Sequence, residues 1–187
     1  MWLHASSFCF NGQNVLILGN SGSGKSTLTL MAHCNGAQII SEENTCICFN
    51  KYSSYIAINK HDIAIFDDEI TTYSVNYSNG AYKTPHSKKN KTMIKAANLS
   101  FVGGMCSPNV IILLNDQKDA LSYTAECSKY HAIKRIIKLH PCFNNYQSTE
   151  WLRMVISMIT NIKIFEITPS YDKEKTYTEI IRILEVM

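Results

Sequence analysis

The sequence predicts an α/β domain whose β-sheet is mixed and flanked by helices. The chain has 187 residues, the length of one ordinary domain, so we expect a single domain spanning residues 1–187. Short apolar runs separated by turn residues fill the first half, which is typical of neighbouring antiparallel strands. A strand–loop–helix unit also lies near the N-terminus, and this mixture favours a mixed sheet over a purely parallel one.

Strands are expected where apolar residues alternate or run continuously. Residues 14–19 contain the run Val15-Leu16-Ile17-Leu18, residues 45–49 alternate, and residues 110–114 are apolar throughout. In chain order the expected strands lie near 5–10, 14–19, 38–41, 45–49, 54–58, 63–66, 92–95, 110–114 and 162–167.

Helices are expected after the first two strands and in the second half of the chain. Their approximate ranges are 25–35, 117–125, 148–160 and 174–185. The last range carries Ile180, Ile181, Ile183 and Leu184 at helical spacing, which predicts a packing face. The most polar region, residues 74–91, is expected to be a loop-like insertion.

Composition argues against several classes of protein. The net charge is only +3, and arginine occurs only at Arg135, Arg153 and Arg182, so no nucleic-acid partner is expected. Residues 1–24 carry no charged side chain, but they lack a basic start and are interrupted by polar residues 11–14, so neither a signal peptide nor a membrane partner is expected. Seven cysteines without a C-x-x-C pair suggest reduced thiols, and we expect a cytoplasmic protein.

One motif carries a strong chemical signal. The run Gly19-Asn20-Ser21-Gly22-Ser23-Gly24-Lys25-Ser26 satisfies the P-loop pattern G-x-x-x-x-G-K-[ST] between an apolar strand and a helix. Its glycines let backbone N–H groups converge on phosphate oxygens, and Lys25 would neutralise the β- and γ-phosphates. Ser26 offers a hydroxyl to Mg²⁺, and Thr27 supports the loop or the start of the helix. The motif therefore predicts ATP and Mg²⁺ as cofactors.

A triphosphate site of this kind also needs an acidic group, and three places in the sequence offer one at a strand end. They are Glu42-Glu43, Asp67-Asp68-Glu69 and Asp116. The alternative for each is a solvated turn, and the residue pattern alone does not choose among them.

The order of these motifs resembles the HPr serine kinase/phosphorylase family. The resemblance rests on Leu3-His4-Ala5-Ser6, the glycine-rich loop with Thr27, and Asn35-Gly36-Ala37-Gln38-Ile39-Ile40-Ser41-Glu42-Glu43, and it covers residues 3–49. It implies a P-loop kinase domain of the HPr kinase/phosphoenolpyruvate carboxykinase type, with a mixed β-sheet flanked by helices. Residues 50–187 are similar in layout to the short, stand-alone members of the family.

The resemblance also implies roles for individual residues. His4 would lie near the reacting phosphoryl group, and Lys25 and Ser26 would bind phosphate and Mg²⁺. Glu42 and Glu43 match the paired aspartates of the family, one acting as base for the acceptor hydroxyl and its neighbour assisting the metal, a role that we assign to Glu43 together with Ser26. This chain departs from the family in having Glu-Glu for Asp-Asp and in lacking an E-V/I-R-G-x-G segment.

The resulting hypothesis is a kinase that transfers the γ-phosphoryl group of ATP to a hydroxyl, that of serine in a peptide or protein. The alternatives are a nucleotide-binding interaction module derived from a kinase, and a small-molecule kinase. The larger family members form oligomers, so a homo-oligomer is a further expected partner. Residues 82–91 form the most basic segment, which suggests a lid with Lys88, Lys89 or Lys91 reaching phosphate, or else an ordinary solvated loop.

Overall fold

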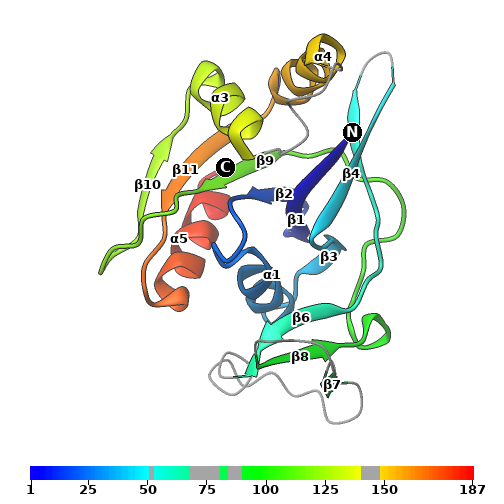
Figure 1. The fold of residues 1–187 in the computed structure, drawn as a ribbon, viewed down its shortest axis with the longest axis vertical. Coiled ribbons are helices and arrows are strands. Elements are labelled where there is room, and N and C mark those ends of the chain that lie inside the picture. Colours follow the sequence, from blue (N-terminus) through cyan, green and yellow to red (C-terminus); the bar gives the residue numbers. More distant parts are fainter. Residues whose placement is uncertain (51–52, 68–80, 84–89, 140–147) are drawn as a thin grey trace.

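The computed structural model describes residues 1–50, 53–67, 81–83, 90–139 and 148–187, and it has the predicted α/β architecture with a mixed sheet (Figure 1). Its strands are β1 (Trp2–Phe10), β2 (Gln13–Leu18), β3 (Gln38–Ser41), β4 (Asn44–Phe49), β5 (Ser54–Ala57), β6 (Ile63–Phe66), β7 (Ala81–Lys83), β8 (Lys91–Ile94), β9 (Val110–Leu114), β10 (Tyr123–Glu126) and β11 (Lys163–Thr168). Its helices are α1 (Lys25–Cys34), the short 3₁₀ helix η1 (Ala96–Asn98), α3 (Lys129–Leu139), α4 (Ser148–Ile159) and α5 (Lys173–Glu185).

The large sheet has the strand order β10-β11-β9-β2-β1-β4-β5, with β3 also paired to β1. Strands β2, β9 and β11 run parallel to one another, and the other pairings in this sheet are antiparallel. The carboxyl ends of the three parallel strands therefore lie at one edge of the sheet, where ligands bind in open α/β folds. The glycine-rich loop, residues 19–26, leaves β2 at this edge and leads into α1.

Helices cover both faces of the large sheet, because its central strands are apolar on both sides. On one face, Leu16 and Leu113 belong to a core cluster that also contains residues of α3 and α4. On the other face, Ile17 and Ile112 belong to a second cluster with residues of α1 and α5. Within the described residues, no helix is both long enough and apolar enough to cross a membrane.

A second, antiparallel sheet with the order β6-β8-β7 packs against α1. Leu30 of α1 forms a third buried cluster that includes Ile63 and Ile65 of β6 and Ile94 of β8. The sequence predicted a loop-like insertion at residues 74–91, but residues 81–83 of that region form strand β7 of this sheet.

The helix predicted at residues 117–125 is wrong. Strand β10 occupies the end of this range and pairs antiparallel with β11, and the preceding turn is tied to the loop before α5 by bonds from Asp119 N to the Pro169 carbonyl (3.0 Å) and from Tyr171 N to the Asp119 carbonyl (3.0 Å). The helix in this part of the chain is α3, which begins at Lys129. Its buried Ala132 and Ile136 lie four residues apart, which is the helical spacing that could have revealed it.

Candidate functional site

The glycine-rich loop closes tightly at the start of α1. Gly22 and Gly24 have φ angles of 82° and 101°, in the left-handed region that favours glycine. Ser23 N donates to the Asn20 carbonyl (3.1 Å), and Leu28 N donates to the Gly24 carbonyl (3.0 Å), which starts the helix directly after the loop. The backbone therefore curls around the N-terminus of α1, whose N–H groups and dipole favour an anion.

Lys25 is buried beneath this loop. Its ammonium group donates to the carbonyl oxygens of Gly19 (2.8 Å) and Asn20 (3.0 Å). Burial lowers the pKa of Lys25, and the charges of Glu42 and Glu43 oppose the shift. The cation is thus held at the base of the loop among neutral carbonyl dipoles and near two carboxylates.

The two glutamates lie at a break in a strand pairing. Strands β3 and β4 pair with β1 one after the other, with Ser41 opposite Ser7 and Asn44 opposite His4. Residues 42–43 interrupt the ladder of hydrogen bonds between them. Glu43 has a φ of 62°, and Asn44 N donates to the Glu42 carbonyl (2.7 Å), so the chain turns sharply here. Breaks of this kind redirect side chains next to active sites.

Glu42 turns inward and accepts a hydrogen bond from the Ser26 hydroxyl through Oε1. Its side chain is buried, and Oε2 makes no hydrogen bond within the described part of the chain. Burial raises the pKa of the Glu42 carboxyl to about 6, although the Ser26 hydroxyl, the nearby Ser6 hydroxyl and the charge of Lys25 oppose this. A buried carboxylate oxygen left without a donor is costly unless a cation or a proton satisfies it.

His4 faces the same break from β1. Its Nδ1 lies 3.1 Å from the Glu43 carbonyl oxygen. A carbonyl only accepts hydrogen bonds, so Nδ1 carries the proton, and Nε2 is left as an acceptor when the ring is neutral. Burial, together with the charge of Lys25, lowers the pKa of His4, while Glu43 opposes the shift.

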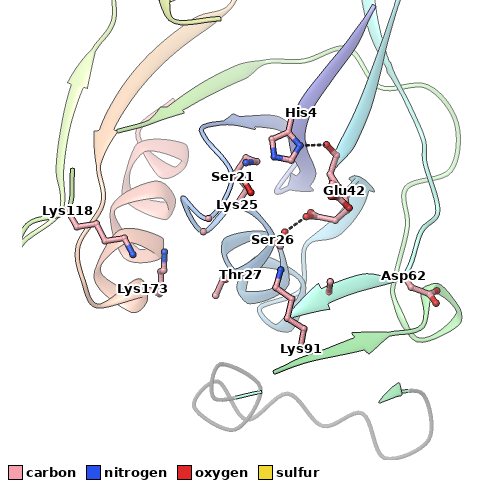
Figure 2. A pocket seen from close by; sticks show the side chains of 14 residues that line it. His4, Ser21, Lys25, Ser26, Thr27, Glu42, Asp62, Lys91, Lys118 and Lys173 are labelled. Atoms are coloured by element: carbon pink, nitrogen blue, oxygen red, sulfur yellow. Dashed lines mark hydrogen bonds between the residues drawn. The ribbon is translucent and has the colours of Figure 1, made fainter. Parts of the chain in front are cut away.

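These groups line a cavity of about 220 Å³ (Figure 2). Of the residues that the sequence predicted for catalysis and for nucleotide or metal binding, the structure brings nine to its wall: His4, Ser21, Gly22, Gly24, Lys25, Ser26, Thr27, Glu42 and Glu43. Gly19, Asn20 and Ser23 are not among the residues that line it. The carbonyls of Gly19 and Asn20 hold Lys25, and that of Ser23 accepts a bond from Lys173 (3.3 Å).

The sequence-based hypothesis missed three charged residues of the wall: Asp62, Lys118 and Lys173. They come from the segment before β6, the turn after β9 and the first turn of α5. One signal could have revealed Lys118, because it lies four residues after the apolar run that ends at Leu114 and hence at the same sheet edge as the glycine-rich loop. No pattern in the sequence pointed to Asp62 or Lys173.

Of the other acidic candidates, the two that the structure describes, Asp67 and Asp116, do not line this cavity. Asp116 is exposed and accepts a bond from the Asn20 amide (2.7 Å), and Asp67 accepts one from the Thr92 hydroxyl (2.7 Å). Asp68, Glu69, Lys88 and Lys89 lie outside the described residues. Of the lysines suggested for a lid, Lys91 is described, and it lines the cavity.

A second cavity of about 480 Å³ adjoins the first and shares Glu42, Glu43 and Asp62 with it. Lys60 and His61 also line it. Two spaces thus meet at the break between β3 and β4, one on the glycine-rich loop and one beside it.

The residues present fit a triphosphate and Mg²⁺. Four lysines and the N-terminus of α1 surround the first cavity, as the charge of a polyphosphate requires. The Ser26 hydroxyl and the unsatisfied Glu42 Oε2 are hard oxygen donors of the kind that Mg²⁺ prefers.

Comparison with known proteins shows a likeness in structure only. No family model matches the sequence, and no curated protein matches it either. The structure is similar to that of the Hpr(Ser) kinase/phosphatase from Coxiella burnetii, with a TM-score of 0.50 and 13% sequence identity, over 99% of this chain and 88% of that chain. At this identity the match confirms the predicted fold, a central mixed sheet flanked by helices.

Proposed function

We propose that this protein is a single-domain kinase that uses ATP and Mg²⁺ to phosphorylate a hydroxyl, that of a serine in a peptide or protein. The observation that carries the proposal is the hydrogen bond between Ser26, at the start of α1, and the buried Glu42. A carboxylate beside the last hydroxyl of a P-loop is suited to holding the Mg²⁺ of a bound triphosphate.

The binding roles follow from this contact. Ser26 and Glu42 would hold Mg²⁺, and the loop N–H groups with Lys25 would hold the β- and γ-phosphates. Mg²⁺ supplies positive charge that bridges and neutralises the phosphate oxygens when it is bound. This arrangement differs from the roles suggested by sequence alone, which assigned the metal to Ser26 with Glu43, since Glu42 is the residue against Ser26.

Glu43 and His4 would serve the acceptor. Glu43 lines both cavities, so its carboxylate can take the proton of the hydroxyl as that oxygen bonds to the γ-phosphorus. The bond from the γ-phosphorus to the β,γ-bridging oxygen breaks in the same displacement, and ADP leaves. Neutral His4, whose Nδ1 proton is bonded to the Glu43 carbonyl, would hold the Glu43 backbone in place beside the acceptor.

The second cavity offers the acceptor a place beside Glu43. It opens next to the first, and Lys60 and His61 give it a polar lining. The name of the similar structure, an Hpr(Ser) kinase/phosphatase, supports a seryl hydroxyl as the acceptor.

The test is transfer of label from γ-labelled ATP in the presence of Mg²⁺ to serine-containing peptides and to free serine. Wild-type protein is compared with Lys25→Ala, Glu43→Gln and Lys163→Ala, the last being an exposed lysine at the start of β11. Binding of ATP is followed in the same samples by calorimetric titration. We expect Lys25→Ala to lose binding and transfer, Glu43→Gln to lose about a hundredfold or more in transfer with binding kept, and Lys163→Ala to lose neither.

Each other outcome has a distinct meaning. Wild-type protein that binds no ATP contradicts the proposal. ATP binding without transfer to any acceptor favours a nucleotide-binding interaction module, and transfer to free serine but to no peptide favours a small-molecule kinase.

A further inference from the structure

We propose that Lys173, in the first turn of the C-terminal helix α5, binds the phosphates of the nucleotide that are not transferred. The inference rests on the proposed function, in that a nucleotide occupies the glycine-rich loop. It adds a phosphate-binding residue from a part of the chain 150 positions away from that loop.

Lys173 lies directly against the loop backbone. Its side chain is buried, its ammonium group donates to the Ser23 carbonyl (3.3 Å), and it lines the first cavity. A Cβ atom built on Gly24 would collide with Lys173 Nζ, so this glycine leaves the room that the lysine fills. These contacts place the positive charge of Lys173 against the part of the loop that would hold phosphate.

The backbone of Lys173 is fixed before any ligand arrives. Asp172 caps α5 by accepting from Glu174 N (2.9 Å), and Ser170 N donates to the Thr176 hydroxyl (2.8 Å). Further along the helix, Ile180 is buried in the core cluster shared with α1. A cation held in place by its own helix loses little conformational freedom on binding, and this favours affinity.

The position of Lys173 indicates which phosphates it would bind. Figure 2 shows Lys173 on one side of the glycine-rich loop, whereas His4 and Glu42 lie on the other. The proposed transfer takes place beside the carboxylates, so a cation on the opposite side faces the part of the nucleotide that leaves as ADP. Lys173 should therefore contribute to the binding of ATP and ADP alike.

Lys118 supports this assignment. It follows β9, lines the same cavity, and in Figure 2 its side chain points toward Lys173. Both side chains bring positive charge to one cavity, and this favours an anion there. The pair is suited to a polyphosphate.

The experiment compares Lys173→Met, which keeps the length of the side chain without its charge, with Lys175→Met two residues further along α5. Lys175 is exposed and does not line the cavity. Affinities for ATP, ADP and adenosine are measured by calorimetric titration. We expect Lys173→Met to bind ATP and ADP about 10- to 100-fold more weakly, as the loss of a charge-assisted hydrogen bond predicts. Adenosine binding by this variant and nucleotide binding by Lys175→Met should not change.

The proposal is overturned if Lys173→Met binds ATP as the wild type does, or loses ATP and adenosine to the same degree. If Lys173→Met fails to fold, the wild-type protein is used instead. Its lysines are acylated with and without inorganic triphosphate, and mass spectrometry measures the labelling of each lysine. Triphosphate should protect Lys173 and leave Lys175 as reactive as before, and equal labelling of Lys173 in both samples refutes the inference. If the wild type binds ATP but replacing or labelling Lys173 shows no link to phosphate binding, only this inference is refuted. A wild type that binds no ATP refutes the proposed function.

Discussion

Glu43 holds its backbone in a conformation that costs free energy. A non-glycine residue in the left-handed region is less stable by roughly 1–2 kcal/mol, and asparagine tolerates the region better because its side chain bonds locally. Strain of this kind persists where the surrounding structure enforces it, often at functional sites. Here it turns Glu42 toward Ser26 and presents the Glu43 carbonyl to His4.

Replacement of Glu43 should therefore separate stability from activity. We expect Glu43→Asn to raise the free energy of unfolding by up to about 1 kcal/mol, since asparagine accepts the left-handed backbone, while phosphoryl transfer is lost with the carboxylate. Urea denaturation and the label-transfer assay measure the two effects. A variant that is less stable than the wild type would show that the Glu43 side chain, and not its backbone, holds the turn.

The raised pKa of Glu42 predicts how stability depends on pH. A carboxyl group with a pKa of about 6 in the folded protein, against an ordinary value of 4.5, favours folding below pH 4.5 and loses that contribution as pH rises through 6. Without metal or nucleotide, Glu42→Gln should equal the wild type in stability near pH 4.5 and exceed it by about 2 kcal/mol at pH 7.5.

Urea unfolding of both proteins at the two pH values checks this expectation. Glu150→Gln serves as the control, because Glu150 is an exposed carboxylate in the first turn of α4. Equal stability of wild type and Glu42→Gln at pH 7.5 would mean that the buried carboxylate is satisfied by the protein itself.

At the scale of elements, the break between β3 and β4 is supported by a chain of buried hydroxyls. The Ser7 and Ser41 hydroxyls lie 2.7 Å apart, those of Ser41 and Thr45 lie 2.6 Å apart, and Thr45 donates to the Ala5 carbonyl (2.7 Å). Ala5 lies on β1 beside the interruption, between its paired neighbours Leu3 and Ser7. The side chain of Thr45 thus supplies a donor where the strand ladder is interrupted.

Thr45→Val should expose the importance of this hydroxyl. The change keeps the shape of the side chain and leaves the Ala5 carbonyl buried without this donor, so we expect a loss of about 1–3 kcal/mol in the free energy of unfolding. Thr45→Ser keeps the hydroxyl and should lose less. Thermal and urea denaturation of the three proteins measure the difference, and a stable Thr45→Val protein with intact transfer would argue against the role of the hydroxyl chain.

The elements also show where sequence patterns were sufficient. The strand before the glycine-rich loop and α1 after it were predicted within a few residues, because a continuous apolar run and a complete motif mark both. The region of residues 117–125 was predicted wrongly, since its polar turn is ordered by bonds to residues 169 and 171 and β10 needs β11 as its partner. Contacts between residues so far apart in the chain produce no periodic pattern in the local sequence.

At the scale of the whole molecule, the site depends on how α1 and α5 pack together. These helices share one core cluster beneath the large sheet, and the glycine-rich loop precedes one of them while Lys173 begins the other. The geometry of the proposed phosphate site therefore depends on the packing of these two helices. Its residues come from segments spread between positions 4 and 173.

Ile180→Ala should weaken the layer and the site together. Ile180 is fully buried, so we expect the free energy of unfolding to fall by about 2–5 kcal/mol, with ATP recovering part of the loss by mass action. Ile156→Ala on α4 is the matched control, because 44% of Ile156 is exposed and its truncation should have little effect. Urea denaturation with and without ATP measures both, and an Ile180→Ala protein as stable as the wild type would contradict the packing described here.

The sequence by itself determined the local parts of this protein: the apolar strands, the glycine-rich loop, and the residues Lys25 and Ser26 that end it. Local backbone preferences and short spacings encode these features, so they are legible without a fold. Only the tertiary structure decided that Glu42 is the residue against Ser26, and that Lys118 and Lys173 join the cavity. Strand register and helix packing set such placements, and both depend on residues far apart in the chain.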